Sequence, residues 1–229
     1  MAREQILEPG GLGRRLFSLS GVVPLGFFLL AHTWANVSAL RGQEAYVHTI
    51  EALLHVPLLV VLEIALVLVP LAYHAGYGLW LMRGGVGEPR AYGRRLAITD
   101  RGAALVALAF IVWHVYELRV GAWRGGLAPE AFYATLVWHL SSTWHGFPVR
   151  AVLYLFGVTA TVFHFAAGAY AYGVTSGLLA TKQQKRRAAW GALALGSLLF
   201  VASSATVISI ATGMELGAPT SSEPCAPKK

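Results

Sequence analysis

The sequence predicts an all-α integral membrane protein, built as one bundle of five transmembrane helices. Hydrophobic residues make up 56% of the 229 residues and charged residues only 13%, unlike the composition of a soluble domain. Five long apolar runs follow one another, and most of the 18 Lys and Arg residues flank these runs. The net charge of +7 therefore indicates membrane anchoring, and we expect no nucleic-acid partner. The single cysteine, Cys225, excludes an intrachain disulfide and a thiolate metal site.

The spans follow from the length of the apolar runs, because a helix needs about 20 apolar residues to cross a bilayer. The runs predict helices I to V at about residues 16–40, 53–82, 97–119, 149–175 and 188–213. Helix II encloses one carboxylate, Glu63, and helix III takes Asp100 and Arg101 into its inner end. Residues 1–214 would thus form one transmembrane domain. The polar residues 215–229, rich in Pro, Ser and Lys, are expected to form a disordered tail.

The stretch between helices III and IV is too polar for a sixth crossing. Residues 131–149 include two histidines, two adjacent serines and a proline. A sixth crossing would also place the basic run KQQKRR on the outer side, against the usual charge bias. We therefore expect residues 129–145 to form an amphipathic helix on the outer surface, with Trp138 and Trp144 at the level of the lipid headgroups.

The basic residues predict that the N-terminus is cytoplasmic, because short cytoplasmic loops are enriched in Lys and Arg. With that orientation twelve of the 18 basic residues lie inside, namely Arg3, Arg14, Arg15, Arg83, Arg90, Arg94, Arg95, Arg101, Lys182, Lys185, Arg186 and Arg187.

Four of the eight histidines lie inside the predicted spans, one in each of helices I to IV: His32, His74, His114 and His164. Polar side chains in a span are costly and usually face the interior of the bundle, so each is a functional candidate. A single buried histidine is as well explained by a hydrogen bond between helices. The pattern of one per helix favours a shared role as metal ligands.

The depths of these histidines group them in two pairs. Helices I and III run outward, and the rise of a helix puts His32 and His114 about 25 and 20 Å from their inner basic residues. Helix II runs inward and leaves His74 about 14 Å from the inner side, while His164 lies about 21 Å below the outer face. An iron held by two histidines needs both at one level. The sequence therefore predicts two stacked b haems, an outer one on His32 and His114 and an inner one on His74 and His164. Two histidines saturate each iron, so these haems would carry electrons.

Three stretches most clearly resemble a known family, and the resemblance extends along all five helices. They are RRLFSLSGVVPLGFFLLAHTWAN at residues 14–36, VWHV around His114, and PVRAVLYLFGVTATVFHFAAGAYAY around His164. They are similar to the cytochrome b558 subunits of succinate dehydrogenases and fumarate reductases. The resemblance implies that the four histidines ligate two haems, first with third and second with fourth. This chain has Asp100 and Arg101 where the family often has a Gln-Arg pair, and Ser176 where it often has a tryptophan.

The resemblance also implies a place in an enzyme complex of a bacterial inner membrane. The chain would anchor a flavoprotein subunit and an iron–sulfur subunit on the cytoplasmic side. Electrons would pass through the two haems to or from a quinone, usually menaquinone in this family. No motif for succinate or flavin is present, so the dicarboxylate chemistry would belong to the partners.

Two carboxylates are candidates for further roles. Glu63 lies 11 residues before His74, about 16 Å nearer the outside, and either delivers protons to a quinone or hydrogen-bonds to helix I. Glu117 follows His114 closely and either lies by the outer haem propionates or marks the end of the span.

Two other classes of function remain open. One is the haem b membrane subunit of another dehydrogenase, of the hydrogenase or formate dehydrogenase type. The other is a haem-free transporter or anchor whose histidines relay protons or join helices.

Overall fold

The computed structural model describes residues 11–83, 91–121 and 128–214, and the regular elements in this part of the chain are all helices. Five helical stretches are long and apolar enough to cross a membrane: Leu12–Arg41, Leu59–Arg83, Arg94–Val120, Val149–Thr175 and Lys182–Thr212. The predicted all-α fold with five membrane spans is therefore confirmed. We number these stretches spans I to V. The expected tail, residues 215–229, lies outside the described residues.

Span I consists of α2 (Leu12–Val22), α3 (Pro24–Val37) and a short 3₁₀ turn η1 (Ser38–Arg41). Its interruption coincides with Pro24, which stands at the first position of α3. Proline has no N–H to donate to the preceding turn, so it suits a helix start and kinks a longer helix.

Span II begins at Leu59, six residues after the expected start, as α5 (Leu59–Glu63), and continues through the π-helical segment η2 (Ile64–Leu68) into α6 (Val69–Arg83). The residues before it form a separate helix, α4 (Gln43–Leu54). The break contains Pro57 and a left-handed Leu58, whose φ is 56°. A leucine rarely adopts this conformation. The residue at position 58 therefore does not mark the break in the way that a glycine would.

Spans III to V are longer and more regular. Span III consists of α7 (Arg94–His114) and a second π-helical segment, η3 (Val115–Val120), and span IV is the single helix α10 (Val149–Thr175). Span V is α11 (Lys182–Thr212), which begins six residues before the expected start at 188. The earlier start has a local cause: Thr181 and Gln184 form a reciprocal capping box, which satisfies free N–H groups of the first turn.

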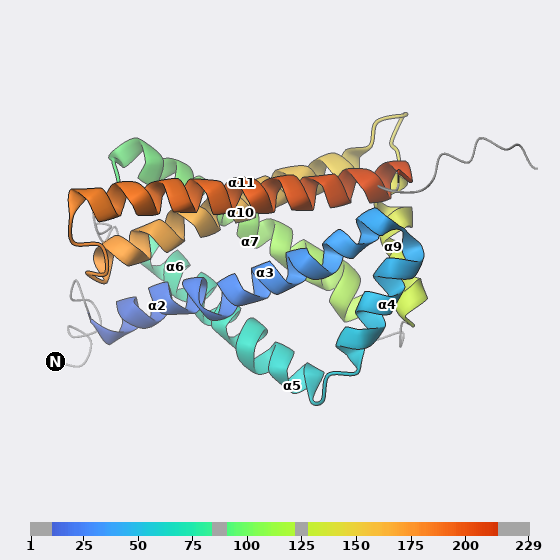
Figure 1. The fold of residues 1–229 in the computed structure, drawn as a ribbon, viewed down its shortest axis with the longest axis horizontal. Helices are drawn as coiled ribbons and strands as arrows, with labels where there is room; N and C mark the ends of the chain where they lie inside the picture. Colours follow the sequence, from blue (N-terminus) through green and yellow to red (C-terminus); the bar gives the residue numbers. More distant parts are fainter. Residues whose placement is uncertain (1–10, 84–90, 122–127, 215–229) are drawn as a thin grey trace, which may run out of the picture.

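The helix expected between spans III and IV is present as α9 (Pro129–Ser141), and it packs against α4 at one end of the bundle (Figure 1). Its Leu136 and Leu140 are buried, whereas Trp138 is 65% exposed. Tyr46 of α4 is buried in the same cluster, and this burial raises its pKa to about 12. The two helices thus cap this end, and their buried residues join one apolar core with residues of spans I, IV and V.

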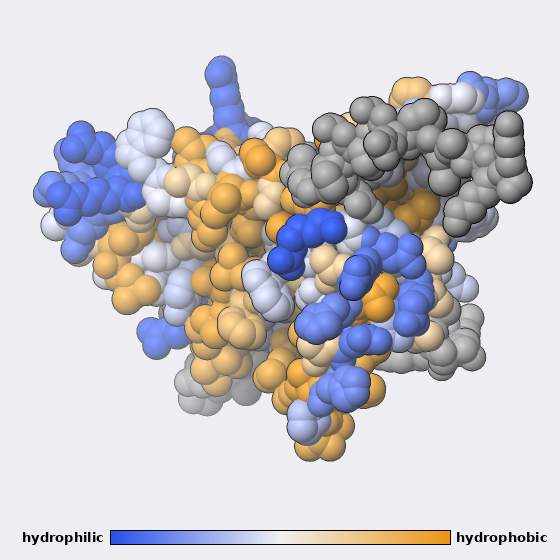
Figure 2. Space-filling view, turned by 45° about the vertical axis from the view of Figure 1, so that its right-hand side comes forward, coloured by the Kyte–Doolittle hydropathy of each residue, from blue (hydrophilic) through white to orange (hydrophobic). Residues whose placement is uncertain are grey.

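The two ends of the bundle differ in charge. Ten of the thirteen described Lys and Arg residues belong to the end where α2, α7 and α11 begin, which we call the basic end: Arg14, Arg15, Arg83, Arg94, Arg95, Arg101, Lys182, Lys185, Arg186 and Arg187. The opposite end, with α4 and α9, is called the far end (Figure 1). Figure 2 shows a broad hydrophobic surface between hydrophilic side chains at its left edge and others toward the right.

Small residues line the interior between the spans, and large apolar residues face outward. Gly157 and Ala160 of α10 are buried, whereas Phe156 on the same helix is 61% exposed. On α11 Ser204 is buried and Val201 is 62% exposed. Small interior residues let membrane helices approach closely, and apolar exterior ones suit lipid.

Candidate functional site

The structure brings the four span histidines together in two pairs, the same two that the depths predict. The ring centroids of His32 (α3) and His114 (α7) lie 5.8 Å apart, and those of His74 (α6) and His164 (α10) lie 6.1 Å apart. An iron with a histidine nitrogen about 2 Å away on each side separates the two ring centres by roughly 6 Å. Each pair therefore fits one bis-histidine iron.

The two pairs occupy different levels of the bundle. Gly21 lies against the His74 ring, and His32 follows 11 residues later on span I, about 16 Å farther along. Asp100 contacts His164, and His114 follows 14 residues later on span III, about 21 Å farther along. Two independent helices thus place the His74–His164 pair toward the basic end and the His32–His114 pair toward the far end.

Hydrogen bonds hold the rings of three of these histidines through Nδ1. Nδ1 of His74 lies 2.9 Å from the carbonyl oxygen of Phe17, and Nδ1 of His164 lies 2.9 Å from Oδ1 of Asp100. These oxygens only accept, so Nδ1 donates and Nε2 is the ring nitrogen that remains for a metal. Nδ1 of His114 lies 3.4 Å from the Tyr154 hydroxyl, a weaker contact. Histidines that bind metals are oriented in this way.

The packing around His74 leaves no room for a side chain at position 21. A methyl group there would lie 2.8 Å from Nδ1 of His74 and closer still to Cε1. The His74 ring is also stacked on Phe17, with centroids 4.5 Å apart and an interplanar angle of 11°. Gly21 therefore permits a close approach of backbone and ring that any other residue would prevent.

Glu63 forms an ion pair with Arg119, so its partner lies on span III and not on helix I. Nε of Arg119 lies 3.1 Å from Oε2 of Glu63, and a second guanidinium nitrogen contacts the same oxygen. Glu63 immediately precedes η2 and Arg119 lies within η3, so both π-helical segments adjoin this pair. Arg119 follows His114 by five residues, which places the ion pair about 7 Å beyond the His32–His114 level.

Glu117 belongs to a second polar cluster at the far end. Its carboxylate lies 3.1 Å from Nη1 of Arg150 and 3.2 Å from Nδ1 of His139, and Arg150 also contacts His139. Burial lowers the pKa of His139 below its usual value, Glu117 opposes this, and the charge of Arg150 reinforces it. The cluster ties span III, α9 and span IV together.

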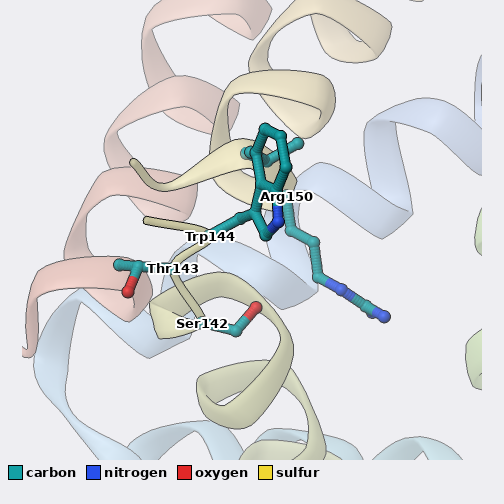
Figure 3. A pocket seen from close by; sticks show the side chains of 5 residues that line it. Ser142, Thr143, Trp144 and Arg150 are labelled. Atoms are coloured by element: carbon teal, nitrogen blue, oxygen red, sulfur yellow. The ribbon is translucent and has the colours of Figure 1, made fainter. Parts of the chain in front are cut away.

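A shallow pocket of about 320 Å³ opens beside this cluster, and its lining consists of Ser142, Thr143, Trp144, Val149 and Arg150. Figure 3 shows the Arg150 side chain extending away from the Trp144 ring. None of the four span histidines lines the pocket. It is therefore separate from the histidine pairs.

A protein whose family is known is similar in sequence to most of the chain. It is the succinate dehydrogenase cytochrome b558 subunit of Bacillus subtilis (strain 168), which is 34% identical over 176 residues, 76% of this chain and 83% of the relative. The chain belongs to the succinate dehydrogenase cytochrome b558 family. The resemblance seen in the sequence is thus confirmed. No family model matches the chain, and no solved structure matches it.

Within this cytochrome b558 chain, the contacts of the histidine rings were not foreseen from the sequence. The sequence places Asp100 at the inner end of helix III without a partner, and it assigns no role to Gly21. A glycine in the middle of an apolar run is a weak signal of close approach. The bond between Asp100 and His164 joins residues 64 positions apart and has no signal in the sequence.

Proposed function

We propose that the protein is the dihaem membrane-anchor subunit of a succinate:quinone oxidoreductase in a bacterial inner membrane. It passes electrons from an iron–sulfur subunit through two b haems to or from a quinone, with menaquinone as the expected quinone. The observation that carries this proposal is the presence of two histidine pairs, spaced for one iron each, at two levels of a membrane bundle.

His32 and His114 would hold one haem iron and His74 and His164 the other. Bound haem b supplies a reversible one-electron couple at each level. The polypeptide orients the ligand rings through the carbonyl of Phe17 and the carboxylate of Asp100. The donor set, two neutral imidazoles at each level, suits a haem that transfers electrons and does not bind oxygen.

The basic end would face the cytoplasm, in keeping with the bias of cytoplasmic loops toward Lys and Arg. The flavoprotein and iron–sulfur partners would then dock at this end, next to the His74–His164 pair. Electrons would reach the quinone side at the far end through the His32–His114 pair. In this arrangement the chain needs no succinate site of its own.

The haem content of the purified chain tests the proposal directly. A pyridine haemochrome assay should give about two protohaems per polypeptide, with a b-type difference spectrum after dithionite reduction. No haem in the membrane-extracted protein would contradict the proposal and would return the histidine pairs to a role in proton relay or helix contacts.

The choice of electron donor separates the succinate complex from other dehydrogenases. A complex purified through a tag on this chain should contain a flavoprotein and an iron–sulfur protein, and succinate should reduce its haem. Reduction by hydrogen or formate, with none by succinate, would assign the chain to the alternative class.

Glu63 is the proposed proton relay to quinone near the His32–His114 level: the carboxylate that pairs with Arg119 would take up a proton from the far end and pass it to the reduced quinone. A lone carboxylate in the hydrocarbon region costs about 3 kcal/mol or more, and Arg119 offsets this cost. We expect Glu63→Gln to slow succinate-dependent menaquinone reduction on the order of a hundredfold, because a positioned acid contributes that much to proton transfer. The rate is measured on the purified complex with a soluble menaquinone analogue.

The control for this variant is Glu44→Gln, which removes an exposed carboxylate from α4 at the same end. Both variants should keep two haems and normal reduction of haem by succinate, so that the defect lies in quinone chemistry alone. A Glu63→Gln complex that reduces quinone as fast as the Glu44→Gln complex would remove Glu63 from the mechanism.

A further inference from the structure

Asp100 is a buried carboxylate placed between two hydrogen-bond donors at the basic end. It is 8% exposed and lies on α7, next to α10, which carries His164. Oδ1 lies 2.9 Å from Nδ1 of His164, and Oδ2 accepts a hydrogen bond of 2.7 Å from the Tyr92 hydroxyl. Each carboxylate oxygen thus has a separate partner, and the group is held from both sides.

Three of the four histidines have an Nδ1 partner, and the three partners differ. A full carboxylate faces His164, a neutral backbone carbonyl faces His74, and a hydroxyl at 3.4 Å faces His114. A charged acceptor draws the Nδ1 proton more strongly than a neutral one and makes the imidazole a better electron donor at Nε2. An electron-rich ligand stabilises the oxidised iron and lowers the reduction potential of the haem.

We propose that Asp100 is a positioning residue for the haem held by His74 and His164, and that its hydrogen bond to His164 lowers the reduction potential of that haem. Tyr92 weakens this effect, because its hydroxyl donates a hydrogen bond to the same carboxylate and so draws negative charge away from His164. The inference rests on the proposed haem sites and adds to them a residue that sets the driving force for electron transfer at one level only.

Two isosteric variants act in opposite directions. Asp100→Asn removes the charge but keeps an oxygen that can accept from Nδ1, so the potential of one haem should move to a more positive value. Tyr92→Phe removes the hydroxyl donor and leaves the whole carboxylate to His164, so the same haem should move to a more negative value. Tyr92→Phe changes no formal charge, which separates the hydrogen-bond effect from a general field effect.

The experiment is a redox titration of the purified full-length chain, followed by absorbance and by electron paramagnetic resonance of the two low-spin haems. Thr99→Val serves as the control, because Thr99 precedes Asp100 and its hydroxyl donates a hydrogen bond to the Arg95 carbonyl, one turn earlier in the same helix. Both midpoint potentials should be unchanged in Thr99→Val. The haem that shifts in the two test variants should be the one that His74→Ala removes.

Haem content is measured in every sample, so that a failure of the proposed function can be distinguished from a failure of the inference about Asp100. A wild-type chain without haem would overturn the proposed function itself. Two haems with unchanged potentials in Asp100→Asn, or equal shifts of both haems, would overturn the inference alone. A shift of the same sign in Asp100→Asn and Tyr92→Phe would also overturn it. Loss of only the His74–His164 haem in Asp100→Asn would support the positioning role, and Tyr92→Phe would then decide the effect on the potential.

Discussion

Replacing His32 with alanine should halve the haem content of the protein, from about two protohaems per chain to about one. The ring of His32 lies 5.8 Å from that of His114 and more than a dozen Å along the bundle from the other pair, so the loss should be confined to one haem. His114→Ala should remove the same spectral component. His74→Ala and His164→Ala should each remove the other component. Haemochrome assays and low-temperature difference spectra measure both results.

The matched control is His55→Ala. His55 is exposed in the turn after α4, and its ring bonds the Glu51 carbonyl in the same helix at 2.7 Å. This variant should keep both haems. Two intact haem signals in His32→Ala would show that the far-end pair does not ligate iron.

A larger residue at position 21 should prevent haem binding at the His74–His164 pair almost as completely as removal of a histidine ligand. A methyl group at this position would overlap the His74 ring, and any shift of the ring would disturb its stacking on Phe17 and its hydrogen bond to the Phe17 carbonyl. We expect Gly21→Val to lose the His74–His164 haem and to keep the haem on His32 and His114. The haem content should therefore fall to about one per chain.

Gly76→Ala provides the control for this steric argument. Gly76 lies on α6 two residues after His74, and a methyl group there would meet nothing within 4 Å. It should bind two haems and reach the membrane as the wild type does. If Gly21→Val also retained two haems with unchanged spectra, the close contact at His74 would have no part in holding the ligand.

The sequence predicts the spans and the grouping of the histidines well because both depend on regular helix geometry. A run of apolar residues fixes a crossing, and a constant rise of about 1.5 Å per residue turns the position of His32 or His114 into a depth. Neither step requires knowledge of which helices are neighbours. The two pairs of rings in the structure are the pairs that these depths predict.

Contacts between helices are less accessible, because they depend on the rotation of each helix about its axis. The Glu63–Arg119 ion pair joins residues 56 positions apart, and the sequence, which leaves proton delivery and a bond to helix I as equal roles for Glu63, does not predict this partner. The apolar run also hides the separate helix α4, because the break after it, at Pro57 and Leu58, contains no polar residue or glycine. The ion pair is a tertiary interaction, whereas the break is a local backbone conformation.

The alternation of the two histidine pairs along the chain constrains biogenesis. His32 of span I meets His114 of span III, and His74 of span II meets His164 of span IV, so each pair joins spans that are not consecutive. The first hairpin to leave the ribosome, spans I and II, contains half of each pair and can complete neither. One site closes when span III enters the bilayer and the other only when span IV does. If the proposed haems bind at these pairs, their loading would follow insertion of spans III and IV, and each haem would link spans that are already in the membrane.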